Sequence, residues 1–357
     1  MKTVLALNSG SSSLKFGVYL VGQGQLDTLL SGEAEGLGSQ DAAFSATGVD
    51  REPLADGSVA GVMQRLEQMQ LPALDVIGHR LVHGGSQLYQ PTLIDAQVLT
   101  QLEQASAFAP LHVPAALKVI EEAGRFFKGV PQVACFDTGF HQHLPSVART
   151  LALPRELREQ GVRRYGFHGL SCASIVRQLG NEVPPRLVIA HLGNGASITA
   201  VHQGQSVDTS MGLTPSGGIV MGTRSGDLDP GVLIYLLRHN KLDADALAQL
   251  IDHQSGLLGI SGLASDMRKL HAAAGHDADA ALAIEMFCQA ARKQIAAMVA
   301  VLEGLDLLVF TGGIGEHDAP VREWVCAGLG WLGVAGKVRV LPSLEDEEIA
   351  RLSAEVV

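Results

Sequence analysis

Short apolar segments separated by polar, glycine-rich or serine-rich stretches recur along the chain. Segments of this length and composition predict β-strands, and they lie at residues 3–7, 16–21, 74–78, 131–136, 186–192 and 305–310. Between them, apolar positions recur at helical spacing. Ile94, Val98 and Leu102 predict a helix over 94–108, and Pro114 marks the first turn of another. We therefore expect an α/β protein.

Further helices are predicted in the second half of the chain. Asp229-Pro230 supplies an N-cap and a first-turn proline for a helix over 230–238, and Asp243 begins the next one. Residues 278–303 contain neither Gly nor Pro, and their apolar positions lie on more than one side. This segment is expected to be the longest helix. Its apolar sides are consistent with burial against its own domain and against a partner chain, and simple core burial is the alternative.

One pattern occurs twice: an apolar strand, a polar turn rich in Gly or Ser, and a second, alternating strand. It covers residues 3–24 and again 186–206, where the turn contains Asn194-Gly195, a strong hairpin signal. A third glycine-rich turn, Gly312 to Gly315, precedes a helix that begins near Asp318. Glycines in such turns let the backbone approach a ligand closely. Strand–turn–strand repeats also arise by chance, so ordinary hairpins are the alternative.

The first of these turns is unusually long and polar. It reads Ser9-Gly10-Ser11-Ser12-Ser13 and is followed by Lys15, whereas a tight hairpin turn needs only one or two such residues. Backbone N–H groups, hydroxyl groups and one ammonium group together favour a phosphate ligand. A flexible, solvated loop is the alternative.

Composition and charge exclude several classes of protein. The 357 residues suffice for about two domains. With 37 acidic and 26 basic residues the net charge is −11, and no Lys/Arg cluster is present, so we expect no nucleic-acid partner. No segment resembles a signal-peptide core or a membrane span, which predicts a cytoplasmic protein without a membrane partner. The four cysteines lie far apart and are expected to be free, mainly buried thiols.

The pattern of elements is interrupted near 138–150 and near 180–186. We place the domain boundary at the first interruption, which gives an N-terminal domain over 1–140 and a C-terminal domain over 141–345. The last helix, 346–357, is expected to pack back on the N-terminal domain.

Two phosphate hairpins in two halves of one chain resemble the plan of the actin, sugar-kinase and heat-shock chaperone superfamily. The competing nucleotide motifs fit poorly, because GxxxxGK(S/T) is absent and no GxGxxG follows a strand. The resemblance implies an α/β fold of two related actin-like (ribonuclease H-like) domains with an ATP cleft between them.

At the level of motifs, the chain resembles the acetate and propionate kinase family. The matching segments occur in one order over nearly the whole chain: NSGSSSLK, RLVHGG, FDTGFH, YGFHG, HLGNGASI, DTSMG, MGTRSGD and FTGGIGE. The resemblance implies reversible, direct in-line transfer of a phosphoryl group from ATP to a small carboxylic acid. It also implies a homodimer formed through the second domain.

The implied phosphoryl transfer requires particular types of residue. A carboxylate acceptor is already ionised at neutral pH, so no general base is needed. Catalysis must come from positioning two anions and neutralising the transferring group, which suits guanidinium groups. By resemblance, Arg80 and Arg224 are the active-site arginines, and His168 donates to the transferring phosphoryl group. An arginine alone is usually in a surface ion pair, but few acidic residues flank Arg224.

A metal site is implied by the same resemblance. Asp137 ends an apolar strand, where a carboxylate is costly unless it is paired or bound to a cation. It resembles the family's magnesium-associated aspartate, and Glu345 is expected to be its partner across the cleft. Mg²⁺ needs few protein ligands because it keeps several waters. With Asn8, these residues form the expected site for Mg²⁺, with Mn²⁺ as an alternative.

The resemblance places the remaining site residues by position in the matched motifs. Those expected to contact ATP or its phosphates are Asn8, Ser11, Ser13, Lys15, His191, Leu192, Gly193, Asn194, Gly195, Asp266, Met267, Arg268, Gly312, Gly313, Ile314 and Gly315. Those expected to bind the acyl group beside Arg80 are Val82, Leu111, Phe167 and Pro215. Val82 occupies volume that a further methylene would need, which favours acetate over propionate.

Some positions depart from the family pattern. The chain has Gly315-Glu316-His317 where the family has GEN, and it lacks a connecting segment between Leu332 and Val338. Two alternative functions remain: a propionate or other short-chain acyl kinase, and a non-catalytic nucleotide switch or chaperone with the same clamp. The switch would need neither paired arginines nor an apolar pocket.

Overall fold

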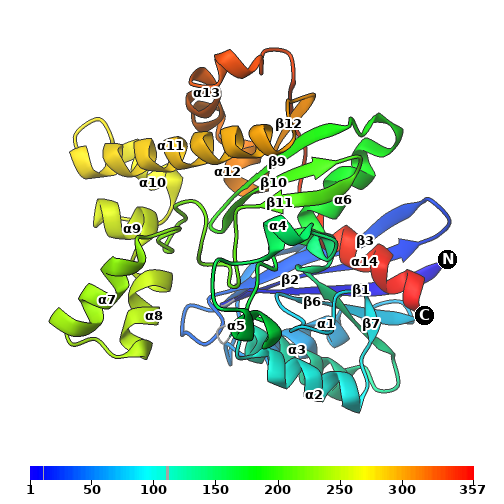
Figure 1. Ribbon diagram of the computed structural model, residues 1–357. Coiled ribbons are helices and arrows are strands. Elements are labelled where there is room, and N and C mark those ends of the chain that lie inside the picture. Colours follow the sequence, from blue (N-terminus) through cyan, green and yellow to red (C-terminus); the bar gives the residue numbers. More distant parts are fainter. Residues whose placement is uncertain (11, 110–111) are drawn as a thin grey trace. The chain divides into compact units, whose positions relative to one another are not determined.

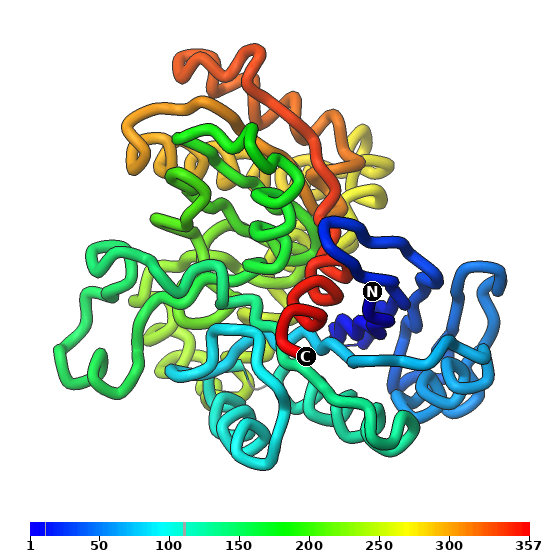
Figure 2. Tube along the Cα trace, turned by 90° about the vertical axis from the view of Figure 1, so that its right-hand side faces the viewer, coloured from blue at the N-terminus to red at the C-terminus, as the bar shows by residue number. Residues whose placement is uncertain are grey.

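The computed structural model describes residues 1–10, 12–109 and 112–357. The chain divides into two compact units: unit 1, Met1–Gly139 with Leu344–Val357, and unit 2, Phe140–Ser343. Both chain ends therefore belong to unit 1, where they lie side by side (Figure 2). The Lys2 ammonium group joins them by donating a hydrogen bond to the carbonyl oxygen of Ala354 at 2.9 Å.

Unit 1 is built on a mixed sheet of order β5-β4-β3-β2-β1-β6-β8-β7 (Figure 1). Its strands are β1 (Lys2–Ser9), β2 (Ser13–Val21), β3 (Leu26–Glu35), β4 (Ala43–Ala46), β5 (Val49–Pro53), β6 (Val76–Leu81), β7 (Thr92–Leu93) and β8 (Gln132–Phe136). Strands β1, β6 and β8 run parallel, whereas β1, β2 and β3 form an antiparallel meander.

Helices cover both faces of this sheet. They are α1 (Val59–Gln68), α2 (Ala96–Ala105), α3 (Val113–Phe126) and α14 (Glu345–Val356). Helices α1 and α3 bury Leu66 and Ala123 against Leu5 and Phe16 of the sheet. Helix α14 packs on β1 and β6 and buries Ile349. This packing brings the first residues of α14 to the end of β1.

Unit 2 contains a second sheet of order β11-β10-β9-β12-β13. Its strands are β9 (Arg186–Leu192), β10 (Ala196–His202), β11 (Gln205–Thr209), β12 (Leu307–Thr311) and β13 (Val338–Val340). Here too an antiparallel meander, β11-β10-β9, is followed by parallel strands, β12 and β13. The two sheets thus share one plan, and the predicted repetition of a strand–turn–strand pattern is confirmed by the β1–β2 and β9–β10 hairpins.

The helices of unit 2 are distributed around this sheet. They are α4 (Ser146–Arg149), α5 (Arg155–Glu159), α6 (Gly169–Leu179), α7 (Pro230–His239), α8 (Ala244–His253), α9 (Gly256–Ser261), α10 (Met267–Ala273), α11 (Ala278–Val301), α12 (Gly312–His317) and α13 (Ala319–Ala327), with short 3₁₀ turns at Gly139–His141, Gly180–Glu182 and Gly330–Leu332. Ile175 of α6 packs on Leu187 and Val309 of the sheet, and α11 packs on β9 and β10.

Most sequence predictions of elements are confirmed. The six apolar segments are strands, and the segment without Gly or Pro is helix α11, Ala278–Val301. Asp229 and Asp243 cap α7 and α8 through their side chains, as predicted. The prediction of a helix over 94–108 is too long, because the Asp95 side chain accepts a hydrogen bond from Val98 N and α2 begins only at Ala96.

Other predictions need correction. Gly312 to Gly315 do not form a turn, because they are the first residues of α12, whereas the helix predicted to begin near Asp318 is confirmed as α13, which Asp318 caps. Strands β3, β4, β5, β7, β11 and β13 were not predicted. The residues of β13 and most of those of β5 lie at the surface, and therefore neither strand has the apolar pattern of a core strand. Three of the four cysteines are buried and all are free. No helix within the described residues is long and apolar enough to cross a membrane.

Candidate active site

A buried ion pair lies at the ends of the parallel strands of unit 1. Arg80, in β6, donates from Nε and Nη2 to Oδ2 of Asp137, at 2.9 and 2.6 Å. Its Nη1 donates to Oδ1 of Asn8, at the end of β1, at 3.2 Å. The Asp137 side chain is only 1% exposed and that of Arg80 17%. The parallel order β1-β6-β8 brings these groups together, because each lies at or directly after the carboxyl end of its strand.

Two further carboxylates reach this cluster from helix α14. Asn8 Nδ2 donates to Oε2 of Glu345 at 3.2 Å and to Oδ1 of Asp346 at 2.7 Å. Glu345 therefore belongs to the same unit as Asp137, and the expectation that it faces Asp137 across a cleft from the C-terminal domain is corrected. The reason is that the chain re-enters unit 1 at Leu344, whose backbone is left-handed (φ 40°), directly before α14.

The cluster carries an excess of negative charge. Burial would lower the pKa of the Arg80 guanidinium, but Asp137, Glu345 and Asp346 outweigh that effect and raise the pKa. Burial raises the pKa of Asp346, and the charge of Glu345 adds to this. Three carboxylates thus act on one buried guanidinium group, an arrangement that a further cation would stabilise.

The oxygen donors of this cluster suit magnesium. No group of three or more His, Cys, Asp or Glu side chains in the described part of the chain is arranged to hold a metal ion. Mg²⁺ does not need one, because it keeps several waters and is usually bound by one or two carboxylates together with substrate phosphates. Asn8, Asp137 and Glu345, with the local negative charge, fit that mode of binding.

Unit 2 carries a second cluster at the turn between β9 and β10. A Cβ atom at Gly195 would lie 3.1 Å from Nε2 of His168 and 3.4 Å from Nη1 of Arg224, so both groups lie next to Gly195. Arg224 Nη1 also donates to the carbonyl oxygen of Pro215 at 3.2 Å. The loop that holds Arg224 is packed so closely that a Cβ at Gly256 would lie 3.0 Å or less from the Arg224 backbone.

His168 has an unusual backbone conformation. Its φ of 57° and ψ of 28° place it in the left-handed region, directly before helix α6. Non-glycine residues adopt this region at a cost, and such strain is typical of functional sites. His168 also stacks on His191, with ring centroids 4.1 Å apart. The structure therefore brings together His168, His191, Gly195 and Arg224, all of which the motifs had singled out.

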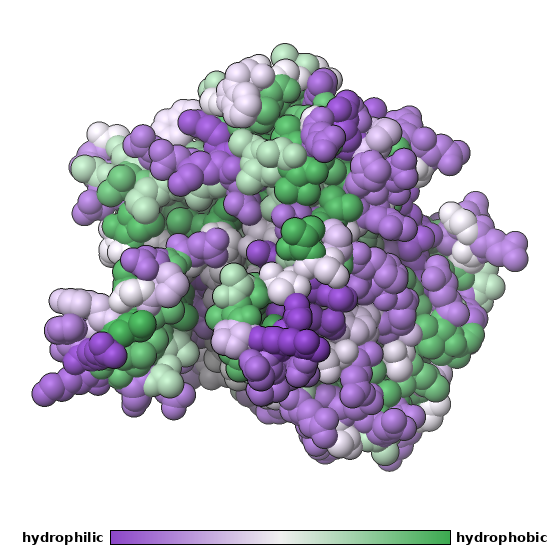
Figure 3. All heavy atoms as spheres, in the orientation of Figure 1, coloured by the Kyte–Doolittle hydropathy of each residue, from purple (hydrophilic) through white to green (hydrophobic). Residues whose placement is uncertain are grey.

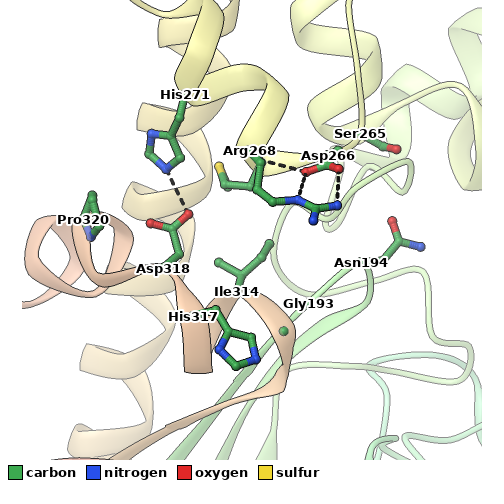
Figure 4. Close-up of a pocket in the computed structure, with 12 residues that line it drawn as sticks. Gly193, Asn194, Ser265, Asp266, Arg268, His271, Ile314, His317, Asp318 and Pro320 are labelled. Atoms are coloured by element: carbon green, nitrogen blue, oxygen red, sulfur yellow. Dashed lines mark hydrogen bonds and ion pairs between the residues drawn. The ribbon is translucent and has the colours of Figure 1, made fainter. Parts of the chain in front are cut away.

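A cavity of about 960 Å³ lies beside this cluster in unit 2 (Figure 4). Asn194 borders it on one side, and Asp266 and Arg268 form an ion pair at 2.7 Å on another. His271 Nε2 and Asp318 Oδ2 lie 2.9 Å apart near His317. The lining residues predicted from sequence are Gly193, Asn194, Asp266, Met267, Arg268, Gly313 and Ile314. The volume suits a nucleotide-sized ligand.

The other predicted residues are distributed over both units. Gly312 lies beside His191, since a Cβ at Gly312 would be 3.1 Å from His191 Nε2. Leu192 ends β9 and Gly315 lies in α12, whereas Ser13 and the exposed Lys15 lie in β2. Val82 and Phe167 are buried, in unit 1 and unit 2 respectively. Ser11 and Leu111 lie outside the described residues.

Several residues of these clusters were missed by sequence reasoning. Asp346 contacts Asn8 more closely than Glu345 does, and its position next to Glu345 could have suggested it. Ser197 Oγ lies 2.9 Å from His168 Nδ1, and Ser171 Oγ lies 2.9 Å from His191 Nδ1. Ser197 follows Gly195 by two positions along the chain, and the alternation of a strand would have placed both on one face.

Two related sheets, a nucleotide-sized cavity and an arginine in each cluster are features of a nucleotide-dependent phosphotransferase, and the family match identifies a carboxyl group as its acceptor. The chain belongs to the Acetokinase family, whose model matches residues 3–349. An acetate kinase of Synechococcus sp. is 42% identical over 356 residues, covering 93% of this chain and 88% of the relative. A propionate kinase of Enterobacter sp. is 44% identical over 344 residues, covering 93% of this chain and 85% of the relative. The crystal structure of a propionate kinase from Francisella tularensis matches with a TM-score of 0.92 and 36% identity, covering 100% of both chains.

Proposed function

We propose that this protein acts as an acetate kinase, transferring the γ-phosphoryl group of ATP to acetate to give acetyl phosphate and ADP, reversibly and by direct in-line transfer. The observation that carries the proposal is that His168 Nε2 and Arg224 Nη1 both lie next to Gly195 in the turn between β9 and β10. A hydrogen-bond donor and a guanidinium group at one turn suit the equatorial oxygens of a transferring phosphoryl group. A nucleotide switch has no need of this pair.

In this mechanism the cluster around Arg80 and the cluster around Arg224 have different roles. Acetate is ionised at neutral pH, so the protein only has to orient it and offset its repulsion from the phosphates. Arg80 and Arg224 supply positive charge, and His168 donates a hydrogen bond. The cavity lined by Asp266, Arg268 and Ile314 is proposed to take the adenosine part of ATP. Mg²⁺, held by Asn8, Asp137 and Glu345, would neutralise phosphate charge.

The direct test traps the product with hydroxylamine. Purified protein is incubated with ATP, Mg²⁺ and hydroxylamine, with acetate, propionate and butyrate in parallel, and the acyl hydroxamate is measured. We expect the highest kcat/KM with acetate and loss of product when EDTA replaces Mg²⁺. ATP hydrolysis without hydroxamate would contradict the proposal and favour the switch. A higher kcat/KM with propionate would instead identify a propionate kinase, the second candidate, which the propionate kinase relatives favour.

Val82 is proposed to set the acyl preference. It is 6% exposed and directly follows β6, which carries Arg80. Val82→Ala should raise the ratio of propionate to acetate kcat/KM by about three- to tenfold, because one buried methylene contributes about 0.8 kcal/mol and pockets discriminate one methylene by about 1–3 kcal/mol. The change should appear mainly in the propionate KM.

A matched variant distinguishes selectivity from simple core packing. Val76→Ala removes the same groups from the opposite end of β6, where Val76 is fully buried. It should lower the melting temperature without changing the acyl ratio. An unchanged ratio in Val82→Ala would exclude Val82 as the selectivity residue.

The enzyme is further proposed to be a cytoplasmic homodimer formed through unit 2. Leu282 and Met286 lie one turn apart on the exposed side of α11 and are 45% and 38% exposed. Helix α7 exposes Ile234 and Tyr235 at 49% and 56%, and Figure 3 shows hydrophobic residues on the α7–α8 hairpin. Such apolar faces are typical of subunit contacts.

Light scattering at micromolar concentration should give the mass of a dimer. Tyr235→Glu and Met286→Glu test the two faces separately, and one of them should yield a monomer because a buried unpaired carboxylate is costly. Glu67→Lys on the exposed side of α1, in unit 1, serves as a surface control. A monomer in the unaltered protein would exclude the dimer.

A further inference from the structure

Each of the two stacked histidines has a buried serine at its Nδ1 atom. Ser197 Oγ lies 2.9 Å from Nδ1 of His168, and Ser171 Oγ lies 2.9 Å from Nδ1 of His191. Both serines are completely buried. The two rings stack at an interplanar angle of 15°.

A third histidine in unit 2 shows which way such a hydrogen bond runs. His141 Nε2 lies 2.9 Å from the carbonyl oxygen of Phe167, and its Nδ1 lies 2.8 Å from Ser206 Oγ. A carbonyl oxygen only accepts, so Nε2 must carry the hydrogen. Burial lowers the pKa of His141 to about 4, which keeps the ring neutral. Its Nδ1 therefore accepts from the Ser206 hydroxyl group.

In the stacked pair, too, we infer that each serine hydroxyl donates to the histidine Nδ1, because a buried donor without an acceptor is costly. Each serine hydroxyl has one hydrogen-bond partner among the described residues, the histidine Nδ1. If Nδ1 donated, the hydroxyl hydrogen would stay buried without an acceptor, which costs about 1–3 kcal/mol. If the hydroxyl donates, its buried hydrogen is accepted by Nδ1.

We propose that Ser197 and Ser171 are positioning residues that hold His168 and His191 as neutral tautomers with the hydrogen on Nε2. The two Nε2–H groups are then aimed at two neighbouring positions. That of His168 lies beside Gly195 and Arg224 Nη1, and that of His191 lies beside Gly312, where a Cβ would be 3.1 Å away. Both rings act as hydrogen-bond donors, and neither gains nor loses a proton.

The consequence for catalysis rests on the proposed function. Phosphoryl oxygens only accept hydrogen bonds, so a histidine with its hydrogen on Nδ1 would present a lone pair to an anion. The serines thus prevent a repulsive tautomer at the site of transfer. Groups that fix the orientation of an active-site histidine typically contribute 10- to 100-fold in activity.

The proposal is tested by nuclear magnetic resonance and kinetics on the full-length protein. With ¹⁵N-labelled histidine, the long-range couplings of each ring report which nitrogen carries the hydrogen, and His168→Gln and His191→Gln variants assign the signals. His141 serves as an internal reference for the Nε2–H form. We expect the same form for both stacked rings at neutral pH, without substrates.

Kinetics then measures what the serines contribute. Ser197→Ala should lower kcat about 10- to 100-fold with the KM values for acetate and ATP within about twofold, and it should give a mixture of tautomers for His168. Ser197→Thr, which keeps the hydroxyl group, should restore most of kcat. Ser174→Ala is the matched control, since Ser174 is a buried serine on α6 that accepts from Gln178 and not from a histidine.

The possible failures are distinguishable. A ring with its hydrogen on Nδ1 in the unaltered protein, or a Ser197→Ala variant with unchanged kcat, would overturn the positioning role while acyl phosphate formation persists. Absence of acyl hydroxamate in the unaltered protein would overturn the proposed function instead, and the tautomers measured without substrate would still decide the inference.

Discussion

Arg224→Ala is expected to lower kcat/KM for acyl phosphate formation by at least about 100-fold while leaving the affinity for ATP nearly unchanged. Removing one preorganised donor to a developing charge typically costs a factor of this size. Arg224 Nη1 lies beside Gly195 and His168 Nε2, whereas the cavity proposed for adenosine is lined by other residues, among them Ile314. The loss should therefore appear in kcat, with ATP affinity measured separately by calorimetry.

Two variants sharpen this test. Arg224→Lys keeps the charge but loses the planar fork, and it should recover only part of the activity because an ammonium group cannot donate bidentately. Arg238→Ala on the exposed helix α7 removes a charge without touching the cluster and should leave kcat unchanged. Turnover near that of the unaltered protein in Arg224→Ala would refute its catalytic assignment.

Arg80→Ala is expected to abolish most activity and, unlike Arg224→Ala, to destabilise the protein strongly. Its removal would leave Asp137, 1% exposed, near Glu345 and Asp346 without a compensating guanidinium group. Breaking a buried ion pair from one side typically costs about 3–5 kcal/mol. Urea unfolding followed by circular dichroism would measure this loss, and hydroxamate formation would measure the activity.

A double variant separates the two effects. Arg80→Met with Asp137→Asn removes both charges, and it should recover much of the stability but none of the activity. Arg155→Ala breaks an ion pair whose side chains are 77% and 60% exposed, and it should leave the unfolding curve unchanged. If Arg80→Ala were as stable as the unaltered protein, the charge balance described for this cluster would be wrong.

The elements that the sequence predicted well are those whose signal is local. A core strand such as β9 contains a continuous apolar run over 187–190, and a cap such as Asp243 acts on its own helix. Both can be recognised in a short window of residues. A strand that is buried on both faces gives a run of apolar residues, and a cap stands directly before the helix whose first turn it binds. The edge strands β5 and β13 have no such pattern, and they form because a neighbouring strand offers hydrogen bonds.

The sequence predicted many of the site residues but not the contacts between them. The motifs named Asn8, Asp137, His168 and Arg224, whereas the contacts of Asn8 with Asp346 and of His168 with Ser197 came only from the structure. Glu345 was also named, but it was assigned to the C-terminal domain, whereas it belongs to unit 1. The chain crosses back to unit 1 one residue earlier, at Leu344, and neither charge nor hydropathy marks that crossing.

By itself, the sequence determined the family, the repeated hairpins and the residue types of a carboxylate phosphotransferase, because these lie in short motifs and local periodicities. The tertiary structure alone decided which carboxylates surround Arg80 and which nitrogen of each stacked histidine is held by a serine. Asn8 and Asp346 are 338 positions apart, and they meet because α14 packs on β1. Contacts of that range depend on how helices and strands pack against one another, and no local pattern encodes them.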